Sequence, residues 1–106
     1  MEITKITKGD NWELTVPGRI DGMTANQLEI EILAAIKAGA KEIFINLSQA
    51  EWICSAGLRV LLQYYRQMKS KGKVLLVTRP SPGISEILAM TAFKDEIVEG
   101  GQSRTS

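Results

Sequence analysis

The chain has 106 residues, of which 44% are hydrophobic and 24% charged, and its formal net charge is +1. These values predict one globular domain with a single hydrophobic core. The balanced charge gives no electrostatic basis for binding nucleic acid or an anionic membrane, and no apolar run approaches the roughly 20 residues of a membrane span. The N-terminus lacks the basic-then-apolar order of a signal peptide, and the single cysteine, which excludes an internal disulfide, fits a reducing compartment. We therefore expect a cytoplasmic protein.

Histidine is absent from the sequence. Its absence removes the commonest general base, the serine–histidine triad and the commonest zinc ligand. Cys54 has neither a histidine to activate it nor a second cysteine to resolve it, so we expect it to pack as a small apolar residue rather than act as a nucleophile. The prediction is a protein that is not an enzyme, with no metal, no cofactor and no small-molecule substrate.

The first predicted elements are two strands that form an antiparallel hairpin. Residues 2–7 and 12–16 are rich in strand-forming side chains, and the second run alternates apolar and polar residues. Lys8-Gly9-Asp10-Asn11 between them is typical of a turn. Pro17-Gly18 ends the hairpin.

A helix follows the hairpin. Thr24 with Gln27 resembles a capping box, and Met23 with Leu28 resembles a hydrophobic staple. Gly39 stands where such a helix ends. The stripe expected to be buried consists of Ala25, Leu28, Ile32, Ala35 and Ile36.

The rest of the chain alternates strands and helices. Strands are predicted at residues 41–47, 73–78 and, at an edge, 96–99; helices are predicted at residues 55–71 and from the Ser81 cap onward. The expected order is β-β-α-β-α-β-α-β, which is a single α/β domain over residues 1–99 with a mixed sheet. Residues 100–106 are small and polar, and we expect a flexible tail there.

The functional interpretation of the sequence depends on Ser55. It stands at the start of the second long helix, where two interpretations compete: an N-cap that only satisfies the backbone, or a phosphoacceptor whose added charge faces free N–H groups and the positive end of the helix dipole. Gly57 removes side-chain bulk, so another molecule could approach the backbone closely.

The segment Ile53-Cys54-Ser55-Ala56-Gly57-Leu58, with a strand before it and Arg59-Val60-Leu61-Leu62 after it, resembles the phosphorylation-site signature of the STAS domain family of bacterial anti-sigma factor antagonists. That signature reads Asp-Ser-(Ser/Thr/Ala)-Gly-Leu. Ser55 falls on the phosphorylated serine of the family. Cys54 replaces the usual aspartate, and this departure puts the presentation of the serine in question. Gly18-Arg19-Ile20-Asp21 resembles the first partner-facing loop of the family.

The resemblance implies a STAS fold and a phosphorylation-switched binding module. The unphosphorylated domain would bind an anti-sigma factor with serine-kinase activity and thereby release a sigma factor. The kinase would phosphorylate Ser55 with ATP and end the complex, and a separate serine phosphatase would reset it. The partner-binding residues that the resemblance implies are Asp21, Gly22, Met23, Ile53, Cys54, Ala56, Gly57 and Arg59.

Alternatives remain open at this point. Arg59, one helical turn after Ser55, could be a solvated side chain, a partner contact or a charge partner for phosphoserine. Met23 could staple the helix or contact the partner. The whole chain could instead be a constitutive scaffold or a sensor-complex subunit on the same fold, in which Ser55 only caps its helix.

Overall fold

The computed structural model describes residues 2–98. Its strands are β1 (Thr4–Lys8), β2 (Asn11–Thr15), β3 (Gly18–Ile20), β4 (Glu42–Asn46), β5 (Ala50–Ile53) and β6 (Val74–Thr78). Its helices are α1 (Gly22–Lys37), α2 (Ser55–Ser70), α3 (Pro82–Ala89) and α4 (Lys94–Ile97). The tail predicted at residues 100–106 lies outside the described residues.

The main sheet is mixed, as predicted. Its strand order is β1-β2-β4-β6, and β1 pairs antiparallel with β2 while the other two pairings are parallel. In this register Leu14, Ile45 and Val77 lie side by side across three strands, and all three are fully buried. Because side chains on neighbouring strands at the same register share a face, this row forms the floor of the core.

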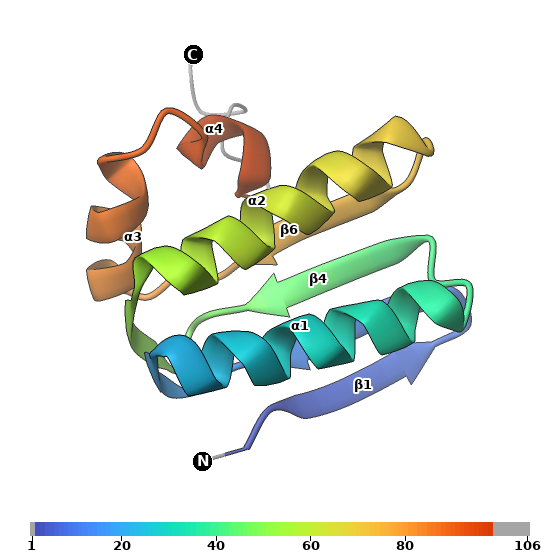
Figure 1. Ribbon diagram of the computed structural model, residues 1–106, viewed down its shortest axis with the longest axis horizontal. Helices are drawn as coiled ribbons and strands as arrows, with labels where there is room; N and C mark the ends of the chain where they lie inside the picture. Colours follow the sequence, from blue (N-terminus) through green and yellow to red (C-terminus); the bar gives the residue numbers. More distant parts are fainter. Residues whose placement is uncertain (1, 99–106) are drawn as a thin grey trace.

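Helices α1 and α2 run side by side across one face of this sheet (Figure 1). Their buried residues complete the core with Leu28, Ile32, Ala35, Leu61, Tyr65 and Met68. The two helices are also joined by a polar contact, since the Tyr64 hydroxyl donates a hydrogen bond to a Glu29 carboxylate oxygen at 2.6 Å. Burial, with the nearby Glu29, raises the pKa of Tyr64 to about 12.

A second, two-stranded sheet was not predicted from the sequence. Strands β3 and β5 pair in parallel, with Arg19 opposite Trp52 and Ile20 opposite Ile53. The Arg19 guanidinium stacks over the Trp52 ring at 4.3 Å from its centre. The sequence does not indicate this sheet, because strands of three and four residues are too short to show a period and their pairing is long-range.

Helix α3 is attached to this small sheet at its first turn. Ser81 caps it as predicted: its hydroxyl oxygen accepts from the Ile84 N–H at 3.2 Å, and the hydroxyl donates to the Ala50 carbonyl at 2.6 Å. A side chain at Gly83 would place its Cβ 2.6 Å from the Glu51 carbonyl oxygen. Glycine therefore allows α3 to lie directly on the backbone of β5.

The prediction of a strand at residues 96–99 is wrong for residues 96–98, which are the part of that range that the structure describes. Residues 94–97 form the short helix α4, in which the Ile97 N–H donates to the Phe93 carbonyl at 3.0 Å. Ile97 and Val98 are buried, as an apolar strand pair would be, but only Val98 bridges the sheet, to Val77. The apolar pair anchors this end of the described chain to the core without extending it as a strand.

Candidate functional site at the starts of α1 and α2

The small sheet places two helix starts next to each other. Ile20 and Ile53 are partners at the carboxyl ends of β3 and β5, and each strand is followed at once by a helix. The Cys54 N–H donates to the Ile20 carbonyl at 2.9 Å, which extends the pairing to the residue before α2. Because the strands are parallel, Asp21 and Cys54 emerge at the same edge of the sheet.

Asp21, and not Thr24, caps α1. Its carboxylate accepts a hydrogen bond from the Thr24 N–H at 3.0 Å, and the helix begins at Gly22. Hydrogen bonding to Thr24 holds the pKa of the Asp21 carboxyl below its usual value of 3.8. The predicted capping box therefore starts three residues too late, because β3 ends at Ile20 and leaves no room for a longer loop.

Met23 does not form the predicted staple. Its side chain is 75% exposed, whereas Leu28 is fully buried, so the two do not share an environment. The helix has already begun at Gly22, and this places Met23 on its solvent face rather than before its cap. Met23 is thus an exposed apolar side chain beside the two helix starts.

Ser55 is the first residue of α2 rather than its cap. The cap is Cys54, whose side chain makes no capping hydrogen bond. The Ser55 side chain is exposed, and its hydroxyl forms no hydrogen bond within residues 2–98. The interpretation of Ser55 as an N-cap is therefore wrong, and what remains is an accessible hydroxyl at the positive end of a sixteen-residue helix.

Two of the residues predicted to contact a partner face inward. Ile53 and Gly57 are buried, and a Cβ at Gly57 would lie 2.7 Å from Ile53 Cγ1 and 3.1 Å from Ile20 Cγ2. The lack of a side chain at Gly57 is therefore used to seat α2 on the small sheet. The prediction that Gly57 lets another molecule approach the backbone closely is therefore wrong.

The other predicted residues come together at the surface. Gly22, Ala56 and Arg59 line a shallow depression of about 240 Å³ between α1 and α2. Asp21 and Met23 are exposed at its α1 side, and Cys54 is half-buried at the start of α2. The two helix starts thus line one depression, and Arg59 also lines the groove that begins at Ser55.

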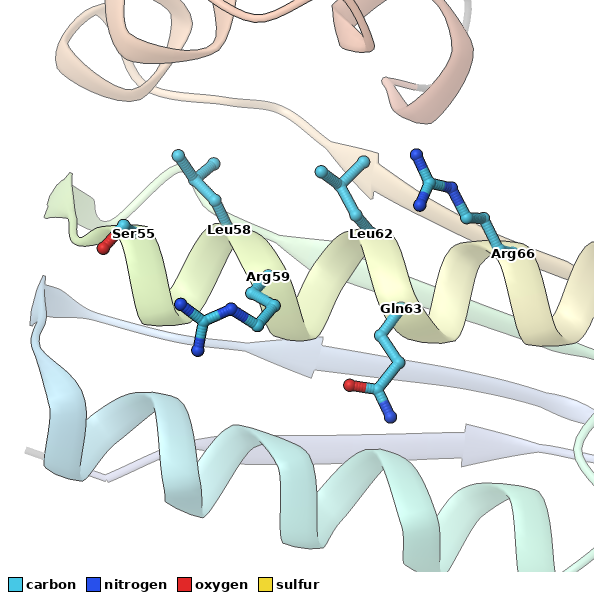
Figure 2. Close-up of a pocket in the computed structure, with 6 residues that line it drawn as sticks. All are labelled: Ser55, Leu58, Arg59, Leu62, Gln63 and Arg66. Atoms are coloured by element: carbon cyan, nitrogen blue, oxygen red, sulfur yellow. The ribbon is translucent and has the colours of Figure 1, made fainter.

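A larger groove of about 490 Å³ extends from Ser55 along α2 (Figure 2). It is lined by Ser55, Leu58, Arg59, Leu62, Gln63 and Arg66. Figure 2 shows Leu58 and Leu62 on one side of the helix, Arg59 and Gln63 on the side facing α1, and the Arg59 guanidinium extending back toward the turn of Ser55. This groove was not predicted from the sequence. Spacings of four residues for the leucines and seven for the arginines were the available signal.

Residues 2–98 contain neither a candidate metal site nor a membrane-spanning helix. Within residues 2–98, no three His, Cys, Asp or Glu side chains are grouped as metal ligands. No helix in that range is both long and apolar enough to cross a bilayer.

Comparison with known proteins finds one matching domain family and several similar anti-sigma factor antagonists. The profile of the STAS domain matches residues 2–105. BtrV of Bordetella bronchiseptica, named as a candidate anti-sigma factor antagonist, is 29% identical over 76 residues, which make up 72% of this chain and 66% of that protein. An anti-sigma-B factor antagonist of Staphylococcus epidermidis is 25% identical over 95 residues, or 90% of this chain and 88% of that protein.

Solved structures share the fold. An anti-sigma factor antagonist from Mycobacterium paratuberculosis superimposes with a TM-score of 0.79 at 21% identity, covering 96% of this chain and 91% of that one. The Bacillus cell fate determinant SpoIIAA in its phosphorylated form superimposes with a TM-score of 0.74 at 17% identity, covering 99% and 100% of the two chains. The mixed sheet and the two adjacent helix starts therefore belong to a recurring architecture.

Proposed function

The chain belongs to the STAS domain family, and from this premise we propose that it is an anti-sigma factor antagonist switched by phosphorylation of Ser55. In its unphosphorylated form it binds an anti-sigma factor that has serine-kinase activity, and a sigma factor is released. Phosphorylation of Ser55 by that kinase, with ATP, ends the complex. A separate serine phosphatase removes the phosphate. The relatives named as antagonists support the first part of this proposal, and the phosphorylated form of SpoIIAA supports the second.

The observation that carries the proposal is the position of Ser55. Its hydroxyl is exposed at the first residue of α2, and the pairing of Ile20 with Ile53 brings the start of α2 next to the start of α1. A kinase can therefore reach the hydroxyl without unfolding the domain. By contrast, the Ser81 hydroxyl is engaged with Ala50 and Ile84, so it is a poorer acceptor.

The same position accounts for both states of the switch. A phosphate on Ser55 faces the positive end of α2, so the fold tolerates the added charge of about −1.5 to −2. At the centre of an interface, the same charge must be desolvated or paired, or it repels the partner. A loss of about 3 kcal/mol of binding free energy corresponds to a weakening of about a hundredfold.

This mechanism requires no catalytic group in the chain, which acts as ligand and substrate of its partner. Asp21, Gly22, Met23, Cys54, Ala56 and Arg59 form the exposed or half-buried surface around Ser55 that the partner covers. Ile53 and Gly57 act from beneath by fixing the start of α2. The experiment that tests the proposal is intact-mass analysis of the chain with its kinase and ATP, together with a binding measurement on the same samples.

A further inference from the structure

The groove along α2 extends beyond the residues that flank Ser55. Leu58 and Leu62 lie half-buried on successive turns, and both side chains point to the same side of the helix (Figure 2). Arg66 lies one turn further on. This arrangement makes a short apolar strip with Ser55 at one end and a cation at the other.

The charge of the groove has one sign. Arg59 and Arg66 line it, no acidic side chain among residues 2–98 does, and neither arginine forms an ion pair within that range. Arg66 is also held in position, because its guanidinium lies over the Phe93 ring at 4.9 Å from the ring centre. The two arginines are seven residues apart, which is about 10.5 Å along the helix axis.

We infer that this groove receives an amphipathic, acidic helix of the anti-sigma partner. The inference rests on the proposed function. Apolar side chains of the incoming helix, spaced three or four residues apart, cover Leu58 and Leu62, and its carboxylates pair with Arg59 and Arg66. A second copy of this chain is a poorer occupant, because an isologous contact through the groove would bring arginines against arginines.

The groove also gives the switch a second component. Phosphoserine at position 55 lies one helical turn from Arg59, within reach of its long side chain. The phosphate takes Arg59 away from the acidic helix and repels the carboxylates of that helix. Phosphorylation thus changes the charge of one end of the groove as well as adding bulk beside it.

The test uses the full chain carrying Ser55→Ala, so that its kinase partner binds it without modifying it. Arg66→Glu is compared with Lys8→Glu, which makes the same change in net charge on β1, the far edge strand of the sheet. We expect Arg66→Glu to weaken the complex by about tenfold or more, and Lys8→Glu to leave it within about twofold. Equal affinities for the two variants, with both shown to be folded by circular dichroism, would overturn the inference while leaving the proposed function intact.

A second experiment tests binding to the groove in the absence of the kinase. A helical peptide with leucines four residues apart and flanking glutamates is added to the ¹⁵N-labelled chain, beside a matched peptide with lysine in place of glutamate. Amide shifts confined to the α2 groove, produced by the acidic peptide and lost in Arg66→Glu, support the inference even if the kinase fails to bind. Equal shifts from both peptides, shifts elsewhere or no shifts contradict it.

Discussion

Asp21 and Cys54 occupy equivalent positions at two adjacent helix starts, but only Asp21 caps its helix. Each is the N-cap residue with extended backbone, at φ −88° and ψ −170° for Asp21 and φ −85° and ψ 172° for Cys54. The Asp21 carboxylate bonds to the third residue of α1, whereas the Cys54 side chain makes no such bond to α2. The signature that residues 53–58 resemble has aspartate at the position of Cys54, where a carboxylate could cap α2 as Asp21 caps α1.

Cys54→Asp should therefore stabilise the protein. A carboxylate there can accept from the first-turn N–H groups of α2 as Asp21 does in α1, a contribution of about 1 kcal/mol. For a domain of this size, the melting temperature should rise by about 4–8 °C. Cys54→Asn is the matched control, because it caps without charge and should give most of the gain. An unchanged melting temperature in both variants would show that a side chain at position 54 does not cap α2.

The same variant tests whether the missing aspartate affects the switch. If the carboxylate helps to present the serine, Cys54→Asp should speed the initial phosphorylation of Ser55 by the kinase, and Cys54→Asn should not. The added negative charge disfavours phosphoserine beside it, so a phosphatase should reset the aspartate variant more easily. Equal initial rates in the parent and Cys54→Asp would mean that cysteine is a neutral replacement.

Gly57→Ala should destabilise the protein, although alanine is the better helix former. The new methyl group would lie 2.7 Å from Ile53 Cγ1 and must displace a buried side chain at a cost of about 1–3 kcal/mol. Gly22→Ala is the control at the start of α1, where a Cβ meets nothing within 4 Å. That change should be neutral or stabilising by up to about 1 kcal/mol. Urea unfolding of both variants measures the difference, and equal effects would contradict the packing described at Gly57.

Much of this fold could be predicted from local sequence patterns. The hairpin, strands β4 and β6, and helices α1 to α3 each carry a period, a turn or a breaker in their own residues. Strands β3 and β5 carry none, because three or four residues become a strand only through pairing with each other. The position of Ser55 at a helix start followed from the helical pattern of the residues after it, whereas the cap at Asp21 depended on where the unpredicted β3 ends. The inward role of Gly57 depended on Ile20, which is distant in sequence, and so required the fold.

The acid dependence of stability should have a component from Asp21. Hydrogen bonding to Thr24 lowers the pKa of this carboxyl in the folded state, so the folded protein favours the ionised form. The resulting stability is present above the usual aspartate pKa and is lost as pH falls through the lowered value. Between about pH 6 and pH 2.5, the parent should lose more unfolding free energy than Asp21→Asn, whose amide oxygen still caps. Parallel losses in the two proteins would show that Asp21 makes no such contribution.

The most direct test of the switch combines mass and binding on the same samples. The parent and Ser55→Ala are each mixed with the kinase partner, and binding and intact mass are measured before and after ATP is added. Because the Ser55 hydroxyl makes no hydrogen bond within the described chain, Ser55→Ala should keep its stability within about 0.5 kcal/mol. We expect the parent to gain one phosphate, mapped to Ser55, and to dissociate, while Ser55→Ala stays unmodified and bound. A parent that gains no phosphate, carries it on Ser48, Ser81 or Ser85, or remains bound when phosphorylated on Ser55 would contradict the proposed switch.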